Sequence, residues 1–185
     1  MTLPASLEGH ERARLFLGLP LPGPVVERLV PWQRDCLRDV RVVSPSHLHV
    51  TLAFLGSTPV IRYDEIAAAL REAAQAAERP VLTVSRYRET RSVAMLVFDD
   101  LEARATRLAG DLHGRLERLG VYERERRPWL PHLTVARFRR PPRLRPELPE
   151  LGEVVPSEAA AFLSRLRPGG AQYEILESVA LGGSG

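Results

Sequence analysis

HLHVTLAFLG at residues 47–56 and PHLTVARF at residues 131–138 repeat one pattern: histidine, apolar residue, threonine, apolar residue. The pattern itself covers residues 49–52 in the first stretch and residues 132–135 in the second. Alternation of this kind predicts a β-strand, in which residues two apart share a face. Each strand would therefore present an imidazole and a hydroxyl together on one surface.

The opposite face of each strand is predicted to pack into a core. Strict alternation places Val50, Leu52 and Phe54 on that face in the first strand, and Leu133 and Val135 in the second. If the two strands meet, the two histidine–threonine pairs would face each other across a cleft.

The stretches around the motif also correspond. Each half of the chain reads as an apolar strand, a helix, a proline-containing link and then the motif strand. We interpret this order as a weak internal duplication within one two-lobed domain, residues 1–185. The pseudo-repeats cover about residues 14–91 and 92–181, and we expect residues 1–12 and 182–185 to be mobile.

Further elements complete the predicted α+β composition. Residues 63–80 are alanine-rich and end before a proline, which predicts a helix. Residues 101–120 keep one apolar face at helical spacing, which predicts another. Residues 158–181 read as two strands joined by a Pro-Gly-Gly turn, and the proline-rich residues 141–153 as a loop.

The composition excludes several classes of protein. The chain is 44% hydrophobic and 26% charged, and no apolar run reaches the roughly 18 residues of a membrane helix. We see no signal peptide, and the one cysteine, Cys36, excludes an internal disulfide. We therefore expect a cytoplasmic protein without a membrane partner, and we take a monomer as the default oligomeric state.

Every basic residue that is not histidine is an arginine. The 26 arginines give a net charge of only +3 with a pI near 9.6. Arginine binds phosphate oxygens bidentately, so clusters of it suit a polyanion, although a solvated basic face is equally consistent. The clusters are Arg124, Arg126 and Arg127, and then Arg137, Arg139, Arg140, Arg143 and Arg145.

Two facing imidazoles suit an in-line displacement at phosphorus. A neutral histidine can accept a proton from the attacking oxygen while a protonated one donates to the leaving oxygen. The threonine hydroxyls can donate to the non-bridging phosphate oxygens. A single histidine on a strand is more often structural, but the matched duplication favours catalysis.

The remaining histidines do not indicate a metal site. His47 and His49 lie two apart and could share a metal ion, yet no carboxylate or cysteine stands near either motif, so we expect no metal and no other cofactor. We interpret His10, His47 and His113 as non-catalytic.

These stretches resemble the two-histidine phosphoesterase superfamily. RLFLGLPLP at 14–22, HVTLAFLG at 49–56, PHLTVARF at 131–138 and FLSRLRPGGAQYEIL at 162–176 are similar to the bacterial and archaeal RNA 2′,3′-cyclic phosphodiesterases, historically called 2′-5′ RNA ligases. The resemblance implies a bilobal α+β fold in which two antiparallel sheets line a central cleft and the helices lie outside.

The resemblance also implies a reaction and its residues. Hydrolysis of an RNA 2′,3′-cyclic phosphate to a 2′-phosphate would use His49 as general acid and His132 as general base, roles that such a pair could exchange. Thr51, Thr134 and Arg137 would contact the phosphate. The implied partners are RNA with a cyclic phosphate end and small cyclic nucleotides.

Two of these positions conflict with strict alternation. Alternation turns Arg137 toward the core, so either the strand bulges after Thr134 or Arg137 lies at the strand end, with Arg139 as the reserve. Phe54 has the same parity problem and could either pack in the core or stack on the terminal base. Trp129 could stack there or brace the strand.

Two alternative functions remain open at the level of sequence. The same site could run in reverse and join a cyclic phosphate end to a 5′-hydroxyl through a 2′-5′ linkage. A non-catalytic RNA-binding module could instead use the arginine clusters alone, and its binding would be sensitive to salt.

Overall fold

The two motif strands lie side by side at the centre of the sheet. The computed structural model describes residues 3–182, and in it the first motif begins β3 (His49–Pro59) and the second begins β6 (His132–Arg137). The strands run antiparallel and pair at one position, Val50 opposite Leu133. These are equivalent residues of the two motifs, so a local twofold axis passes between them.

The remaining strands extend the sheet on both sides of this pair. The order is β4-β5-β6-β3-β1-β7-β8, every neighbouring pair is antiparallel, and the short β2 pairs with β6. The other strands are β1 (Arg12–Pro20), β2 (Arg41–Val42), β4 (Leu82–Glu89), β5 (Val93–Asp100), β7 (Glu158–Arg167) and β8 (Gly170–Ala180).

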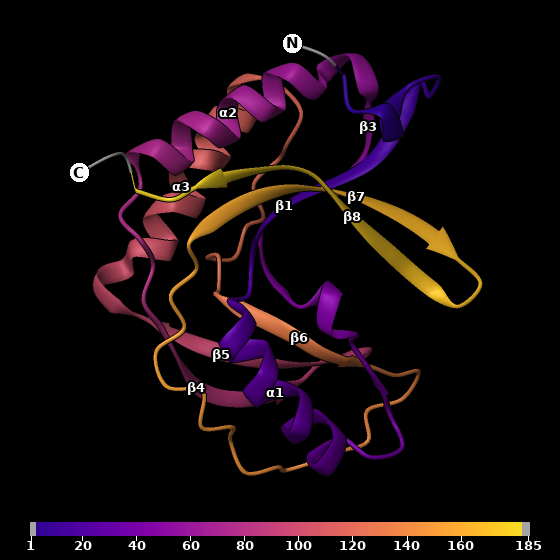
Figure 1. Ribbon diagram of the computed structural model, residues 1–185, viewed down its shortest axis with the longest axis vertical. Helices are drawn as coiled ribbons and strands as arrows, with labels where there is room; N and C mark the ends of the chain where they lie inside the picture. The colour runs from indigo at the N-terminus through magenta and orange to yellow at the C-terminus, as the bar shows by residue number, and fades with distance from the viewer. Residues whose placement is uncertain (1–2, 183–185) are drawn as a thin grey trace.

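The predicted α+β fold with antiparallel strands and outer helices is confirmed, with one difference. Two sheets were expected, whereas hydrogen bonding joins all eight strands into one curled sheet. The pairing of Val50 with Leu133 is the join, and it is narrow because the strands diverge on either side of it. The lobes are therefore the two halves of a single sheet, visible in the upper and lower parts of Figure 1.

The helices connect the two halves of the chain. The helix α1 (Gly23–Cys36) follows β1 but contacts β6 through Gln33, and its Trp32 packs edge-on against Tyr87 of β4. The helix α3 (Arg104–Arg118) follows β5 but contacts β3 and α2 (Tyr63–Ala76). Figure 1 shows α1 beside β4, β5 and β6, and α2 with α3 beside the other lobe. Each half of the chain thus supplies a helix to the other half's motif strand.

Both long predicted helices form, with apolar faces buried. In α3, the residues Ala105, Leu108, Leu112 and Leu116 are at most 2% exposed, as the helical spacing predicted. The carboxylate of Asp100 accepts hydrogen bonds from the first backbone N–H groups of α3, including that of Ala105 at 3.0 Å, and so caps the helix.

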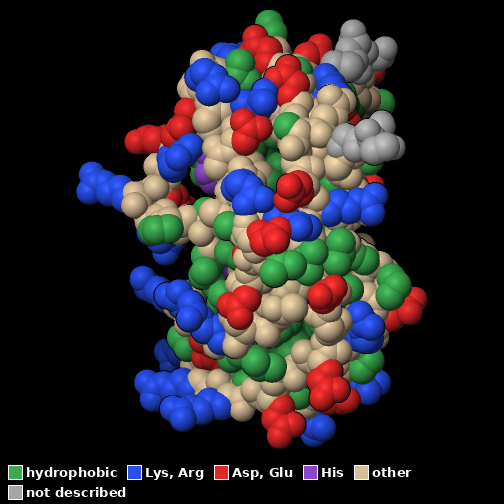
Figure 2. Space-filling view, turned by 90° about the vertical axis from the view of Figure 1, so that its left-hand side faces the viewer, with side chains coloured by type: hydrophobic (Ala, Val, Ile, Leu, Met, Phe, Trp, Pro, Cys, Tyr) green, Lys and Arg blue, Asp and Glu red, His purple; other side chains and the backbone are tan. Residues whose placement is uncertain are grey.

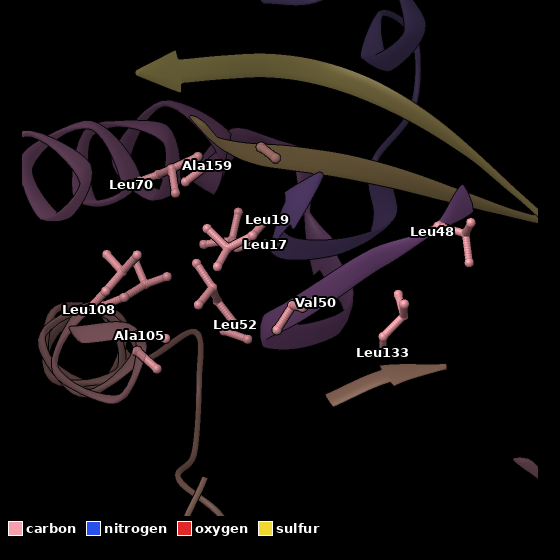
Figure 3. Packing of buried hydrophobic residues seen from close by; sticks show 14 of the residues in the cluster. Leu17, Leu19, Leu48, Val50, Leu52, Leu70, Ala105, Leu108, Leu133 and Ala159 are labelled. Atoms are coloured by element: carbon pink, nitrogen blue, oxygen red, sulfur yellow. The ribbon is translucent and has the colours of Figure 1, made fainter. Parts of the chain in front are cut away.

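The motif strands anchor the core as predicted, apart from Phe54. Val50, Leu52 and Leu133 are at most 1% exposed, and Figure 3 shows Leu52 between Leu17 of β1 and the helix that carries Leu108. Phe54 is 49% exposed, so of the two placements that the sequence left open for its ring, the core position is excluded.

The chain ends differ from the predicted mobile segments. Leu7 is fully buried within the short 3-10 helix Ala5–Leu7, so this part of residues 1–12 packs against the domain. The expectation of mobility for residues 1–2 and 183–185 lies outside the described residues. Residues 141–153 contain no helix or strand, which confirms the predicted loop. In residues 3–182 no helix has the length and apolarity needed to span a membrane.

Candidate active site

The two motif histidines are held in the same way. His49 Nδ1 lies 2.7 Å from the carbonyl oxygen of His47, and His132 Nδ1 lies 2.8 Å from that of Leu130. A carbonyl can only accept, so each Nδ1 carries the hydrogen and donates it. Each ring therefore keeps its Nε2 atom for proton exchange.

The antiparallel pairing brings each histidine close to the other strand's threonine. Because Val50 lies opposite Leu133, the residue before Val50 is beside the residue after Leu133. His49 therefore lies on the side of Thr134, and His132 lies on the side of Thr51. The Thr51 hydroxyl is also 3.1 Å from Nε2 of His49. The four motif side chains thus converge on one place.

Both motif strands bulge at the same position. In the pairing of β1 with β3 the register skips Leu52, and in that of β5 with β6 it skips Val135. Each skipped residue follows its motif threonine directly. An extra residue reverses the alternation beyond it. As a result, two buried residues stand in a row in each strand and the next residue is exposed.

The bulges bring Phe54 and Arg137 to the cleft. Both line the same cavity as His49. Of the two explanations considered for Arg137, the bulge after Thr134 is present, and Arg137 is also the last residue of β6. The guanidinium of Arg14 lies 4.7 Å from the centre of the Phe54 ring. Arg139 follows the end of β6 and is exposed. It lines none of the three main cavities found in residues 3–182.

Two neighbouring cavities meet at the motif strands. The first, of about 750 Å³, contains His49, Thr134 and Arg137, and is bounded by β7 and β8. The second, of about 940 Å³, contains His132 and is bounded by α3 and residues 122–130. Thr51 and Phe54 line both, so the two cavities form the arms of one cleft.

Three aromatic rings surround His49. The ring of Phe16 stacks on it at 4.7 Å between centroids, Phe162 lies at 5.4 Å, and Tyr173 meets it edge-on at 5.5 Å. Burial among these rings, with a smaller contribution from the nearby charge of Arg137, lowers the pKa of His49 from its ordinary value of 6.5 to about 4. The unliganded site therefore holds His49 neutral at pH 7.

Backbone packing beneath His49 is close as well. A Cβ added at Gly18 of β1 would lie 2.9 Å from the carbonyl oxygen of Val50 and 3.3 Å from the His49 ring. Glycine is required here because no larger residue fits between β1 and the motif strand.

Arginine side chains surround the second arm of the cleft. Arg88, Arg124, Arg126 and Arg127 line it, together with Trp129. The Trp129 indole N–H donates to the carbonyl of Thr51 at 3.1 Å, so Trp129 braces β3 against the second motif. Figure 2 shows basic side chains projecting along one edge of this side of the molecule, with a histidine visible in a recess among them.

Comparison with known proteins identifies the family. The profile of the 2′-5′ RNA ligase superfamily matches residues 22–167. The chain belongs to the 2′-5′ RNA ligase superfamily. A relative from Thermus thermophilus, named RNA 2′,3′-cyclic phosphodiesterase, is 34% identical over 182 residues, covering 92% of this chain and 91% of the relative.

Solved structures of other proteins share the fold. The structure of TT0787 from Thermus thermophilus has a TM-score of 0.78 at 30% identity, covering 93% of this chain and all of that one. The apo structure of E. coli LigT has a TM-score of 0.78 at 23% identity, covering 94% of this chain and 99% of that chain. Both similarities extend over nearly the whole domain.

The sequence did not predict several residues of the candidate active site. The aromatic rings around His49 come from β1, β7 and β8, far from the motif in the chain. His47, set aside as non-catalytic, lines the first arm, and its Nε2 accepts the backbone N–H of Tyr173 at 3.3 Å. Only the repeated alanine after each bulge, Ala53 and Ala136, signals the local irregularity in the sequence.

Proposed function

We propose that this protein hydrolyses the terminal 2′,3′-cyclic phosphate of RNA to a 2′-phosphate by general acid–base catalysis. The observation that carries the proposal is the matched pair of histidines, each fixed through Nδ1 by a carbonyl two residues earlier, with Nε2 left for the substrate. The name of the Thermus relative, RNA 2′,3′-cyclic phosphodiesterase, supports the substrate class.

The proposed reaction assigns one proton transfer to each histidine. His132 accepts a proton from water as the water oxygen attacks phosphorus. The bond between phosphorus and the 3′ oxygen breaks, and His49 donates a proton to that oxygen, which leaves as the 3′-hydroxyl. The hydroxyls of Thr51 and Thr134 donate to the non-bridging oxygens, where negative charge increases in the transition state.

The acid role of His49 requires proton uptake with the substrate. Burial holds His49 neutral in the unliganded site. The bound cyclic phosphate carries a negative charge, which would raise the pKa of His49 and offset the positive charge of Arg137 beside it. We propose that the substrate binds together with a proton, and that Arg137 contacts a phosphate oxygen.

The two arms of the cleft suit the two sides of an RNA end. Phe54 lies where the arms meet and offers a half-exposed ring on which the terminal base can stack. The arginines of the second arm suit the phosphates of the preceding nucleotides. Small cyclic nucleotides would use only the centre of this cleft.

The decisive experiment follows the product of a 2′,3′-cyclic-ended oligonucleotide. The wild-type protein should give a 2′-phosphate, and His49→Ala and His132→Ala should each lower the rate by roughly 10²–10⁴-fold, the range for loss of a general acid or base. EDTA should leave the rate unchanged. Full activity of both variants would refute the proposal, and salt-sensitive RNA binding without turnover would favour a binding module. A 2′-5′-linked product from two RNA fragments would favour ligation.

A sulfur-substituted substrate separates the acid from the base. A cyclic phosphate with sulfur in place of the 3′ bridging oxygen releases a thiolate, which needs no proton on leaving. His49→Ala should recover most of its activity on this substrate, and His132→Ala should not. The reverse result would exchange the two roles.

A further inference from the structure

Two buried polar side chains hold the bulges of the motif strands. Gln33 of α1 and His113 of α3 are 3% and 4% exposed, among the few polar side chains buried in residues 3–182. The His113 Nε2 atom lies 2.7 Å from the carbonyl oxygen of Leu52. The Gln33 Nε2 atom lies 2.8 Å from the carbonyl oxygen of Val135.

The two accepting carbonyls belong to equivalent residues. Leu52 and Val135 each lie three residues after a motif histidine, and each is the residue that the register skips. A bulge disrupts the regular ladder of sheet hydrogen bonds, so a buried carbonyl there needs a partner from elsewhere. In both strands a side chain from the helix of the other half of the chain donates to this carbonyl, and at Val135 the backbone N–H of Val43 donates as well, at 2.9 Å.

Both side chains must act as donors. The acceptors are carbonyl oxygens, so His113 carries its hydrogen on Nε2, and Gln33 turns its amide nitrogen toward Val135 and toward Val43, 3.1 Å away. Tyr122 stacks on the His113 ring at 4.7 Å between centroids and fixes its plane. The two side chains differ in type, yet they perform one task at two equivalent places.

We propose that Gln33 and His113 are positioning residues for the substrate, an inference that rests on the proposed function. By fixing the bulge at Leu52, His113 sets the direction of Phe54, two residues further along. By fixing the bulge at Val135, Gln33 sets the direction of Arg137. Figure 3 shows Leu52 beside the helix with Ala105 and Leu108, the helix that carries His113. His113 therefore governs the base subsite, and Gln33 governs the phosphate subsite.

The test compares variants that lose the donor with variants that keep it. His113→Phe and Gln33→Met remove the hydrogen-bond donor at similar side-chain volume. His113→Gln and Gln33→His keep a donor, because each position receives the residue type found at the other. Kinetics would be measured on a cyclic nucleotide and on ribose 2′,3′-cyclic phosphate, which lacks a base. Hydrogen exchange of the backbone N–H groups of residues 53–54 and 136–137 gives a readout that does not depend on turnover.

The two donor-free variants should fail in different ways. His113→Phe should raise KM for the cyclic nucleotide at least about fivefold, the scale of one lost base stack, and leave the base-free substrate unaffected. Gln33→Met should lower kcat about tenfold or more on both substrates, since a misplaced phosphate contact weakens transition-state binding. Backbone hydrogen exchange should accelerate only at the bulge that the substituted side chain contacts. The donor-retaining variants should recover at least half of each change in KM or kcat.

Several outcomes would overturn the inference. Wild-type kinetics and exchange in both donor-free variants would do so, as would equal losses in donor-free and donor-retaining variants. If His113→Phe does not fold, His113→Asn, whose shorter amide falls short of Leu52, replaces it. If the wild-type protein turns over no cyclic phosphate, the proposed function fails, and the exchange measurement alone decides whether the two side chains hold the bulges.

Discussion

Phe54 and Arg137 occupy equivalent positions in the two halves of the cleft. Each is five residues after a motif histidine and is the first exposed residue beyond a bulge. The pseudo-symmetric framework thus presents an aromatic ring on one side and a guanidinium on the other. We infer that the catalytic pair stayed symmetric while the neighbouring pair diverged, which gives one substrate orientation to a nearly symmetric site.

Replacing Phe54 should impair binding without destabilising the protein. A base–aromatic stack contributes about 1–3 kcal/mol, so Phe54→Ala should raise KM for a cyclic nucleotide at least about fivefold. The ring is 49% exposed, so the free energy of unfolding should change little. Phe54→Trp serves as the control and should retain a low KM. An unchanged KM in Phe54→Ala would assign the ring no part in binding.

Substitutions of Arg137 and of Arg139 should have very different effects on kcat/KM. A hydrogen bond to a charged group contributes about 1.5–3 kcal/mol, so Arg137→Ala should lower kcat/KM at least about tenfold. Arg139→Ala is the matched control outside the cleft and should stay within roughly twofold of wild type, as surface substitutions usually do. Steady-state kinetics on the same cyclic nucleotide would measure both, and the opposite order would move the phosphate contact to Arg139.

The pKa of His49 should be directly measurable by NMR titration of its ring. Burial among the aromatic rings lowers it to about 4 in the unliganded protein. Inorganic phosphate, bound beside Arg137, should raise it toward the ordinary value of 6.5. If phosphate binds and the pKa does not rise, proton uptake with the substrate is excluded.

The same shift makes stability depend on pH. The unfolded chain protonates His49 near its ordinary pKa of 6.5, whereas the folded protein protonates it near 4. Between these values the unfolded state binds more protons, so stability falls as pH falls from about 6.5 to 4. The loss is on the order of 3 kcal/mol at about 1.4 kcal/mol per pKa unit. Urea unfolding of wild type and His49→Gln would be measured at pH 7, 6 and 5. The difference between their free energies of unfolding should change with pH, and a constant difference would contradict the pKa shift.

Gly18→Ala should damage catalysis through crowding. The added Cβ would lie 2.9 Å from the carbonyl oxygen of Val50, so the motif strand must move and carry His49 with it. We expect kcat to fall about tenfold or more, because small misplacements of reacting groups are costly. Gly23→Ala is the control, since nothing lies within 4 Å of its added Cβ. Equal kinetics in the two variants would show that the site tolerates the shift.

Local pattern was sufficient to predict the motif strands, the helices and the buried side of the central pair. Val50, Leu52 and Leu133 are buried because alternation holds up to the bulge. Beyond it strict alternation placed Phe54 in the core wrongly, since it assumes an unbroken ladder of strand pairs, although base stacking had been kept open for this ring. For Arg137 the family resemblance exposed the conflict that a bulge then resolved.

The surroundings of His49 could not be predicted in the same way. Phe16 meets it because β1 pairs with β3, and Phe162 and Tyr173 meet it because β7 and β8 extend the sheet beyond β1. No local signal specifies these pairings. The role of His113 was hidden for a similar reason. Its place beside the apolar stripe of a helix was evident, but the carbonyl it reaches belongs to a distant strand.

From the exchange of helices between the halves we predict the order in which the chain folds during synthesis. β3 leaves the ribosome early, yet the helix that supplies His113 to it is complete only at Arg118. We therefore expect β3, the central strand of the first half, to be fully covered only after α3 of the second half has been synthesised. A chain cut between the halves should yield two fragments that bind each other, and neither should fold as an autonomous unit.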